Sequence, residues 1–525
     1  MAHDWTKVQH ERKWSILGMQ KRFALWAIYS SIGCMMMGFD FGNAGTITAF
    51  PAFQQVMGKP YAGQASGYLI SASIQSAWNG VATAGDIAGV MVSGQVLDRI
   101  GRKHSILFGV VFTAVGIGMQ YASQEWKLYL GGRLVNSIGF GIVYVVAPVW
   151  IGETVRPELR GLFLCINNFS IVFGQFILAL VAYGAQKVQG RWSYEIVILV
   201  QFVFVAVLIV GYPFFPESPY HLLKNNNEER ARTMLRRIHG SGDEGLIDAE
   251  IIRMKEGIAI SQNLEEQAQL NGPLIAQCFQ GSNLKRTMIS MLAVASQQLI
   301  GAAFVLGYIT YFLDLIGIDN YFVVSVVLYV IMLLSNLVAF PFIEIFGRRP
   351  LLLFGIFGLT AVLLLMGIMG FVHTSGAVWV VLVCIFLWAI IYQLTIGAVG
   401  FALAYEVATP QLRPMTASIV GFSQGAAGWV IGFVVPYMIN PDAGNLGAKV
   451  GLVFAGLGVP LCIAFWFMIP ETKGLGFADL DYMFSAKVKP RHFKRVFAER
   501  QAAEADSSEN GDLKNDAVTA QVEAV

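Results

Sequence analysis

The stretch DRIGRK at residues 98–103 decides the fold, because EIFGRR at residues 344–349 repeats its pattern 246 residues later. Two further motifs recur at similar offsets of 253 and 254 residues: Glu153, Pro157 and Arg160 return as Glu406, Pro410 and Arg413, and Pro216-Glu217-Ser218 returns as Pro470-Glu471-Thr472. Three motifs at one near-constant offset indicate two homologous halves. Duplicated halves are typical of transporters, which bind their solute between the halves.

The segments between these motifs are apolar. The 525-residue chain is 55% hydrophobic and 13% charged, whereas soluble proteins are about 25% charged. A membrane-spanning helix needs about 20 apolar residues. The sequence therefore predicts an all-α membrane protein with twelve transmembrane helices in two six-helix halves, at about 24–46, 68–97, 105–122, 127–150, 162–185, 194–214, 289–313, 321–344, 350–371, 377–405, 416–439 and 448–469.

The distribution of Lys and Arg predicts the orientation. With both termini in the cytosol, cytosolic segments hold thirty of the 36 basic residues and outer loops hold five, as the positive-inside rule requires. The expected domains are a cytosolic N-terminal tail (1–23), a six-helix half (24–214), cytosolic linker helices (215–288), a second half (289–469) and a cytosolic tail (470–525). The tail after about position 485 is rich in charged and small residues, so we expect disorder there.

The motifs resemble those of the sugar porter family of the major facilitator superfamily. The similar stretches run in the family's order: 98–103, 153–161 (ETVRPELRG), 216–222 (PESPYHL), 297–301 (QQLIG), 344–349, 406–413 and 470–474 (PETKG). Stretches such as GYITYFLDLIG and GAVGFALAYEVATPQLR look most like fungal maltose and α-glucoside proton symporters. The resemblance implies a plasma-membrane sugar importer that works by alternating access.

Charged residues flank the helices at the expected cytosolic side. Arg and acidic residues at inner helix ends can pair across neighbouring helices, and such pairs must break when the inner mouth opens. The resemblance implies a lock that holds the outward-facing state, although basic residues there also serve as topology signals. The expected gate residues are Asp98, Arg99, Arg102, Glu153, Arg160, Glu344, Arg348, Glu406 and Arg413.

Three charged residues lie well inside predicted helices, away from the helix ends. A charge at a helix centre costs about 2.5–3.5 kcal/mol on insertion scales, so it should face a partner or a cavity. Asp40 and Arg133 each lie about six residues from the outer end of their helices, which predicts a pair at matching depth. The resemblance implies proton coupling through this pair, and the alternative is a permanent structural ion pair. Asp86 is a second candidate for coupling, or a helix-packing residue beside Gly85 and Gly89.

A sugar site needs amide side chains and aromatic faces. Gln297 and Gln298 match paired glutamines that contact sugar in the family, and Gln424 matches another sugar-contacting amide. Compared with hexose carriers, Ala303, Phe401 and Gly425 are smaller than the expected residues, which favours a roomier site for a di- or oligosaccharide. Amide contacts between helices are the alternative role for the full set of candidates, which is Gln297, Gln298, Asn168, Gln175, Gln393 and Gln424.

Several patterns are missing from the sequence. It contains no G-x-x-x-x-G-K-[ST] loop for ATP and no metal-ligand clustering of its seven His residues, and no nucleophile constellation, so we expect no enzyme activity. No cofactor is expected, with the proton as coupling ion. The expected partners are a sugar, protons and the lipid bilayer, without nucleic acid, and we expect a functional monomer. An uncoupled hexose facilitator, a non-transporting sugar sensor and a metabolite exporter remain alternatives.

Overall fold

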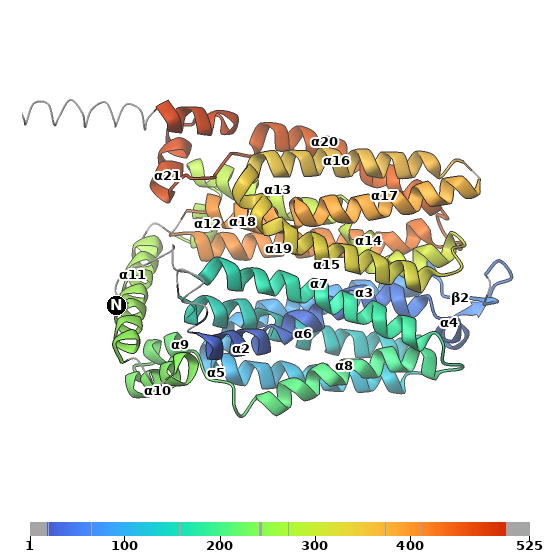
Figure 1. Cartoon of the computed structure of the whole chain (residues 1–525), viewed down its shortest axis with the longest axis horizontal. Coiled ribbons are helices and arrows are strands. Elements are labelled where there is room, and N and C mark those ends of the chain that lie inside the picture. Colours follow the sequence, from blue (N-terminus) through green and yellow to red (C-terminus); the bar gives the residue numbers. More distant parts are fainter. Residues whose placement is uncertain are drawn as a thin grey trace, which may run out of the picture.

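The computed structural model of the chain is a bundle of long helices (Figure 1). It describes residues 18, 20–64, 66–156, 159–240, 244–270, 272–372, 374–409 and 411–499. The first half contains α2 (Lys21–Ser30), α3 (Ile32–Thr48), α4 (Pro51–Met57), α5 (Ala72–Ala122), α6 (Trp126–Thr154), α7 (Arg160–Ala185) and α8 (Trp192–Gly211). Together with a short antiparallel pair, β1 (Lys59–Pro60) and β2 (Tyr68–Leu69), these form the lower layer of Figure 1.

The second half forms the upper layer of the same view (Figure 1). It contains α13 (Gly281–Leu299), α14 (Ala302–Leu315), α15 (Tyr321–Phe346), α16 (Arg348–Met369), α17 (Ser375–Leu394), α18 (Ile396–Val407), α19 (Arg413–Ile439), η3 (Gly447–Lys449) and α20 (Val450–Met468). Between the halves lie α9 (Pro219–Lys224), α10 (Glu228–His239), α11 (Glu244–Leu270) and α12 (Leu274–Cys278), and α21 (Phe477–Ser485) and η4 (Pro490–His492) follow α20.

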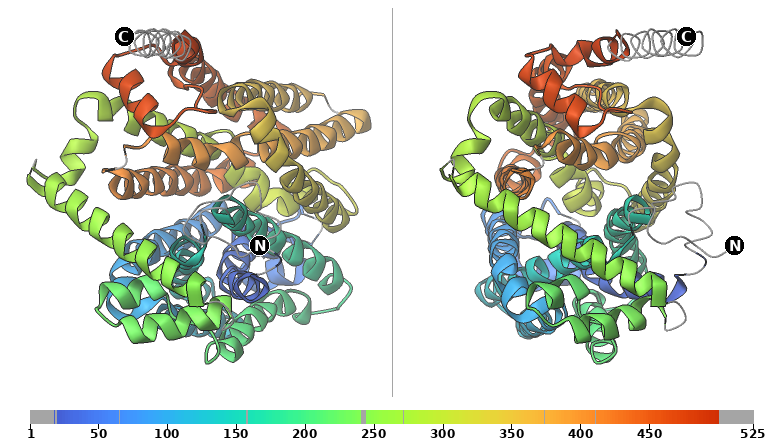
Figure 2. Two further views of the ribbon diagram at one scale, coloured as in Figure 1. Left: turned by 60° about the vertical axis from the view of Figure 1, so that its left-hand side comes forward. Right: turned by 90° about the vertical axis from the view of Figure 1, so that its left-hand side faces the viewer.

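The two ends of the bundle differ in what covers them. We call the end that carries α9 to α12 and α21 the linker end, and the end that carries α4 and β1–β2 the opposite end (Figure 1). Figure 2 shows α11 crossing the linker end diagonally, from the first half toward the second. The linker thus packs across both halves at one end.

The helices are long and apolar enough to cross a membrane. Eleven helical segments of the described chain meet this requirement, and α5 supplies two crossings because Gly101, with φ 86° and ψ 169°, divides it. The predicted twelve-helix fold is therefore confirmed. Large apolar side chains such as Val210 and Phe354 are 70% and 65% exposed, as expected for a surface that faces lipid.

Glycines allow two helices of the first half to cross closely. A Cβ at Gly38 of α3 would come within 1.9 Å of the Ile171 carbonyl oxygen on α7, and a Cβ at Gly174 would come within 2.0 Å of the Met35 carbonyl oxygen. Small residues that let backbones approach are typical of membrane helix packing. This crossing helps to set the position of the α3 segment that carries Asp40.

Two predicted helices of the second half are broken near their middles. Gly301, with φ 92°, separates α13 from α14, and Thr395, with φ −123° and ψ −96°, separates α17 from α18. A Gly at a left-handed position ends a helix without strain from a Cβ. Discontinuous helices near the membrane midplane are a feature of transporter binding sites.

Two details outside the two six-helix halves differ from the predictions. The sequence predicts a set of short helices in the linker, but the linker contains the 27-residue helix α11. The tail continues in order beyond residue 485, because η4 follows at Pro490–His492 and Phe493 is fully buried against Phe484 at a ring distance of 5.2 Å. One well-placed aromatic residue anchors a segment that its composition alone describes as disordered. Residues 500–525 lie outside the described chain.

Candidate functional site

Asp40 and Arg133 form an ion pair inside the first half. The Arg133 guanidinium donates a hydrogen bond to the Asp40 carboxylate, and the two side chains are 4% and 3% exposed. The pair joins α3 to α6, as their matching depths predict. Bringing both charges out of water is costly unless they pair, so removing either charge leaves the other unpaired in the membrane.

A small cavity adjoins this pair. Arg133, Gln75, Tyr129 and Tyr308 line it together with apolar residues. Its free volume is about 10 Å³, which is near the lower limit for one water molecule. The first half contributes Arg133 and Gln75, and the second half contributes Tyr308. The ion pair therefore borders a space where the two halves meet.

Asp86 lies on α5 within electrostatic range of both Asp40 and Arg133. Its Oδ1 atom is buried and has no hydrogen-bond partner among the described residues. The neighbouring glycines do permit close helix approach, because a Cβ at Gly89 would lie 2.4 Å from the Ile138 carbonyl oxygen of α6. Asp86 therefore lies near a charge pair, on a helix that packs closely against α6. These surroundings are compatible with either of its two predicted roles.

The predicted amides of the second half gather at the two helix breaks. Gln297 donates from Nε2 to the Ile396 carbonyl, just after the α17–α18 break, at 3.2 Å. Its Oε1 accepts hydrogen bonds from the Tyr392 hydroxyl at 3.3 Å and from Gln424 Nε2 at 3.4 Å. Gln298 is buried, and its Oε1 has no partner among the described residues. The structure therefore brings Gln297 and Gln424 together and leaves a polar atom of Gln298 available.

Aromatic residues complete this region. The Trp388 indole donates to the Ile300 carbonyl at the α13–α14 break, at 3.0 Å. Its ring stacks on Tyr392, with centroids 4.7 Å apart. Amides beside stacked aromatic faces match what a sugar requires. Neither aromatic residue was predicted from the sequence, although two aromatic residues four positions apart in an apolar helix lie on the same helix face and could have indicated the site.

The other three predicted amides are not hydrogen-bonded to Gln297 or Gln424 in the described chain. Asn168 is half-buried on α7, and Gln175 is 2% exposed two turns further along the same helix, with an Oε1 that has no described partner. Gln393 is 3% exposed near the end of α17. No hydrogen bond among the described residues links these three side chains to Gln297.

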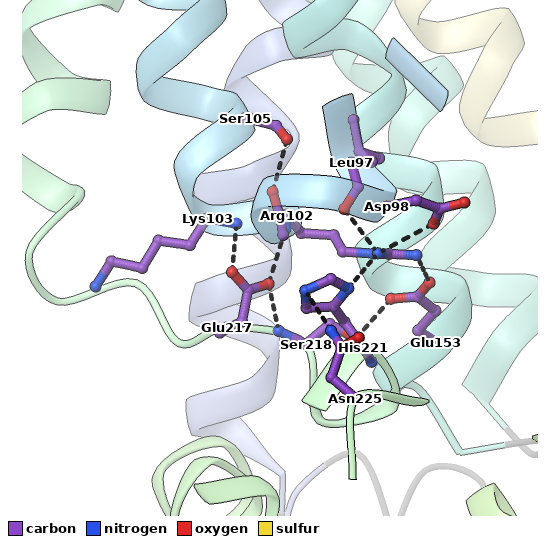
Figure 3. Close-up of polar contacts among 11 residues, drawn as sticks. Leu97, Asp98, Arg102, Lys103, Ser105, Glu153, Glu217, Ser218, His221 and Asn225 are labelled. Atoms are coloured by element: carbon purple, nitrogen blue, oxygen red, sulfur yellow. Dashed lines mark hydrogen bonds and ion pairs between the residues drawn. The ribbon is translucent and has the colours of Figure 1, made fainter. Parts of the chain in front are cut away.

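Figure 3 shows the charged network at the linker end of the first half. Arg102 donates from Nη2 to Glu153 and from Nη1 to the Leu97 carbonyl at 3.0 Å, while Asp98 lies 3.6 Å from Nη1. The Ser218 hydroxyl donates to the other Glu153 oxygen at 2.5 Å. The network joins both parts of α5 to α6 and to the start of α9.

Glu217 accepts hydrogen bonds from main-chain groups in the same network. The N–H groups of Arg102 and Lys103 donate to its two oxygens at 2.8 and 3.1 Å. The positive φ of Gly101 sets up this arrangement, because a Cβ there would lie 2.4 Å from a Glu217 oxygen. The glycine of the repeated motif is thus required both by the backbone angle and by the carboxylate.

The second half repeats this network with the equivalent residues. Arg348 donates from Nη2 to Glu406 at 2.6 Å, and the Thr472 hydroxyl donates to the other Glu406 oxygen at 2.5 Å. Main-chain N–H groups of Arg348 and Arg349 donate to Glu471 at 3.0 and 3.3 Å. The internal repeat read from the sequence therefore corresponds to a repeated structure.

The two networks differ in burial and at one position. The side chains of Arg102 and Glu153 are 7% and 14% exposed, whereas those of Arg348 and Glu406 are 21% and 29% exposed. His221 has its Nδ1 3.0 Å from Arg102 Nη1, and the corresponding residue of the second half is Leu475. Burial and the neighbouring Arg102 charge lower the pKa of His221 below its usual 6.5, so this residue is neutral at pH 7.

The remaining predicted gate residues are less informative. Arg99 is exposed beside Asp98. Arg413 begins α19 and is half-buried. The side chains of Arg160 and Glu344, and the whole of Pro157 and Pro410, lie outside the described residues.

Hydrogen bonds join the two halves at the opposite end. The N–H of Ala72, at the start of α5, donates to Asp442 at 3.1 and 3.2 Å. Asn440 donates to the Ile70 carbonyl at 2.9 Å and accepts a bond from the Tyr311 hydroxyl. Gln75 donates to Asn440 Oδ1 at 3.3 Å. Sequence reasoning missed these residues because nothing in the local pattern links positions about 370 apart.

Comparisons with known proteins agree with this architecture. The profile of the family described as "Sugar (and other) transporter" matches residues 26–484. The MFS transporter fmqE of Aspergillus fumigatus is 28% identical, over 92% of this chain and 91% of its own. A general alpha-glucoside permease of Saccharomyces cerevisiae is 26% identical, over 90% and 76%, and the high glucose sensor RGT2 of the same species is 26% identical, over 88% and 60%.

The fold is also found among solved structures. The inward-open xylose transporter XylE from E. coli is similar with a TM-score of 0.70 and 20% identity, over 88% of this chain and 99% of that chain. Relatives with assigned roles are transporters, permeases and a sensor, not enzymes. The family profile, the duplicated motif networks and the twelve-crossing bundle together show that the chain belongs to the sugar transporter family of the major facilitator superfamily.

Proposed function

We propose that the chain imports a sugar together with a proton, by alternating access between its two halves. The observation that carries the proposal is the buried Asp40–Arg133 pair, which borders the small cavity between the halves. A charge pair so deep in a membrane protein is costly and commonly marks an ion pathway. The proposed orientation places the linker end in the cytosol and the chain in the plasma membrane, where it acts as a monomer in the bilayer.

Proton binding at Asp40 provides a physical route to coupling. A protonated Asp40 no longer neutralises Arg133, so the guanidinium becomes available to another acceptor. Gln75 lines the same cavity, its side chain is 2% exposed, and its Oε1 has no partner among the described residues. Because Gln75 also donates to Asn440 across the halves, a shift of Arg133 toward Gln75 would act directly on the contact between the halves.

Asp86 adds a second acid to the same region. A single Arg133 cannot neutralise two nearby carboxylates in a buried site, so the group favours one bound proton. In this proposal Asp86 influences the uptake and release of the proton, while the protonation of Asp40 determines whether Arg133 stays paired.

The proposed sugar site lies at the breaks of α13–α14 and α17–α18. Gln297, Gln298 and Gln424 supply amides, and Trp388 and Tyr392 supply aromatic faces. Asn168, Gln175 and Gln393 are proposed to join the site as the halves rearrange. We propose an α-glucoside or another di- or oligosaccharide as substrate, in line with the permease relative and with the small residues at Ala303 and Gly425.

We propose a narrower role for the ion-pair networks than a lock that breaks when the inner mouth opens. Arg102–Glu153 and Arg348–Glu406 each form within one half, in a structure whose opposite end is joined by hydrogen bonds. We propose that they keep the inner ends of each half rigid, so that the halves move as units.

An uncoupled facilitator and a sugar sensor are the two alternatives to symport. An uncoupled hexose facilitator would use the same sugar site without a proton. A sugar sensor is favoured by the 26% identity to the high glucose sensor RGT2, and it would signal without appreciable transport.

The test is uptake by the full chain in yeast that lacks its own sugar carriers. External pH is recorded while glucose, maltose, sucrose, raffinose, cellobiose and lactose are added in turn, with labelled uptake in parallel. Alkalinisation that accompanies uptake of an α-glucoside supports the proposal. Uptake without a pH change would support a facilitator, and a surface-localised chain that gives neither signal would support a sensor.

A further inference from the structure

A basic pocket lies at the linker end of the first half, outside the proposed sugar path. Its walls come from the second part of α5, the end of α8, and helices α9 and α10, and its polar lining includes Lys103, His104, Tyr212, Arg230 and Arg237. The free volume is about 510 Å³, within the range of small-molecule sites. The pocket is large enough for a phosphorylated headgroup.

The charge of this pocket is strongly positive. Arg230 and Arg237 are exposed and lie two turns apart on α10, and neither has an ion-pair partner among the described residues. Lys103 donates from Nζ to the Pro213 carbonyl at 3.1 Å and forms no ion pair within the described part of the chain. Figure 3 shows its side chain pointing away from the Arg102–Glu153 pair.

The acidic residue in the pocket is largely occupied. Glu217 accepts main-chain hydrogen bonds from Arg102, Lys103 and Ser218, at 2.8 to 3.1 Å. His104 lies 3.9 Å from one of its oxygens. One carboxylate offsets only part of the charge of Lys103, Arg230 and Arg237, so the pocket keeps a net positive charge.

The same helix offers a direct contrast on its other face. Arg232 pairs with Asp248 at 2.5 Å, and Arg236 pairs with Glu244 at 2.9 Å. Those pairs attach α10 to α11. Arg230 and Arg237 differ because they line the pocket and have no such acid beside them.

The pocket adjoins an apolar surface. Phe108 and Val111 of α5 are 41% and 54% exposed, and Val210 and Phe214 at the end of α8 are 70% and 60% exposed. The Lys103 ammonium lies 5.1 Å from the Tyr212 ring centre. Basic and Tyr side chains at the edge of an apolar belt are typical of the depth of lipid headgroups.

We propose that this pocket binds the phosphorylated headgroup of an anionic phospholipid, whose acyl chains lie along the exposed apolar surface of α5 and α8. Arg guanidinium groups match phosphate oxygens in geometry and charge, and basic pockets beside membrane helices bind such headgroups. The adjoining apolar surface favours a lipid over a soluble phosphate. A bound headgroup would bridge α10 to α5 and so fix the linker against the first half.

Native mass spectrometry of the purified full-length chain tests this proposal. The chain is titrated with phosphatidylinositol 4-phosphate, with phosphatidylcholine and with soluble inositol 1,4,5-trisphosphate. The test variant is R230Q/R237Q, and the matched control is R232Q/R236Q, which removes two arginines from the other face of the same helix. Tryptophan fluorescence during heating checks that both variants are folded.

We expect the wild-type chain to prefer the anionic lipid over phosphatidylcholine. Each basic residue near a lipid surface contributes favourable binding free energy. The test variant lacks two such residues and should lose about 30-fold in affinity, while the control should lose less than threefold. Equal losses in both variants would overturn the proposal, because they indicate diffuse surface charge. Equal binding of both lipids, or of the soluble trisphosphate as tightly as the anionic lipid, would overturn it as well.

Discussion

The two ends of the bundle are held by different kinds of interaction. At the linker end, the repeated motifs form ion pairs inside each half, with Arg102 bonded to Glu153 and Arg348 bonded to Glu406. At the opposite end, neutral side chains and main-chain groups join one half to the other through Asn440, and the carboxylates of Asp442 and Asp314 accept further bonds from the first half. Strong, buried pairs suit parts that move as units, and single hydrogen bonds of about 1 kcal/mol net suit an interface that must open.

The largest effect should come from breaking the more buried ion pair. Glu153→Ala leaves the Arg102 guanidinium, with 7% of its side chain exposed, only the solvent-exposed Asp98 carboxylate as an ion-pair partner among the described residues, which should cost about 3 kcal/mol. Glu406→Ala is the matched change in the second half. There Arg348 is 21% exposed, and the loss should be about 1 kcal/mol.

Thermal unfolding followed by fluorescence-detected chromatography measures both variants. The double variant Arg102→Ala/Glu153→Ala should recover part of the loss, since it removes both charges. Equal destabilisation by the two single variants would show that burial does not distinguish the two halves.

The next effect concerns the opposite end. Asn440→Ala removes the bonds to Ile70 and Gln75 that join the halves. About 2 kcal/mol of lost stabilisation should raise the population open at that end about 30-fold. Electron-spin distances between labels at Gln124 and Asp319, both exposed at that end, report the opening.

The control for this change is Asn320→Ala. Asn320 precedes α15 and makes no side-chain cap hydrogen bond, so its removal should leave the distance distribution unchanged. An unchanged distribution for Asn440→Ala as well would mean that these bonds do not hold the opposite end closed.

The third prediction concerns the pH dependence of stability at the linker end. Burial, with the charges of Arg156 and Arg253, lowers the pKa of His239 from 6.5 to about 3. The folded chain then binds fewer protons than the unfolded chain, so stability is complete above pH 6.5 and falls as pH decreases toward 3. At pH 5 the loss from His239 should be about 2 kcal/mol, and His221 contributes in the same direction.

Unfolding of His239→Gln between pH 5 and 7.5 checks this assignment. The variant should lose much less stability on acidification than the wild type, and the control His104→Gln, at an exposed position, should behave as the wild type does. A steep pH dependence that persists in His239→Gln would place its origin elsewhere.

The same contrast explains what could be predicted from the sequence. The twelve crossings and the repeated networks were predictable, because apolar length and fixed motif spacing are local signals. The Asp40–Arg133 pair was predictable because charges are rare inside membrane helices and depth limits the possible partners. The contacts of Gln75 with Asn440 and of Asp442 with Ala72 were not, because they depend on how the halves dock.

The helix breaks show a second limit. Gly301 and Thr395 lie within continuous apolar stretches, so hydropathy merges the helices on either side of them. The interactions that stabilise the breaks, from Trp388 to Ile300 and from Gln297 to Ile396, involve partners about 90 residues or more apart. The family resemblance therefore located Gln297, but it did not reveal the geometry around it.

The central claim, proton coupling through Asp40, is tested most directly by separating accumulation from exchange. Asp40→Asn is reconstituted in vesicles with the sugar that the uptake screen identifies, beside Glu195→Gln, which removes another buried acid of the first half. A potential of 100 mV supplies about 2.3 kcal/mol per proton and one pH unit about 1.4 kcal/mol, enough for several-hundred-fold accumulation. We expect the wild type and Glu195→Gln to accumulate sugar, and Asp40→Asn to keep exchange and lose accumulation. Accumulation by Asp40→Asn at the wild-type level would contradict the account.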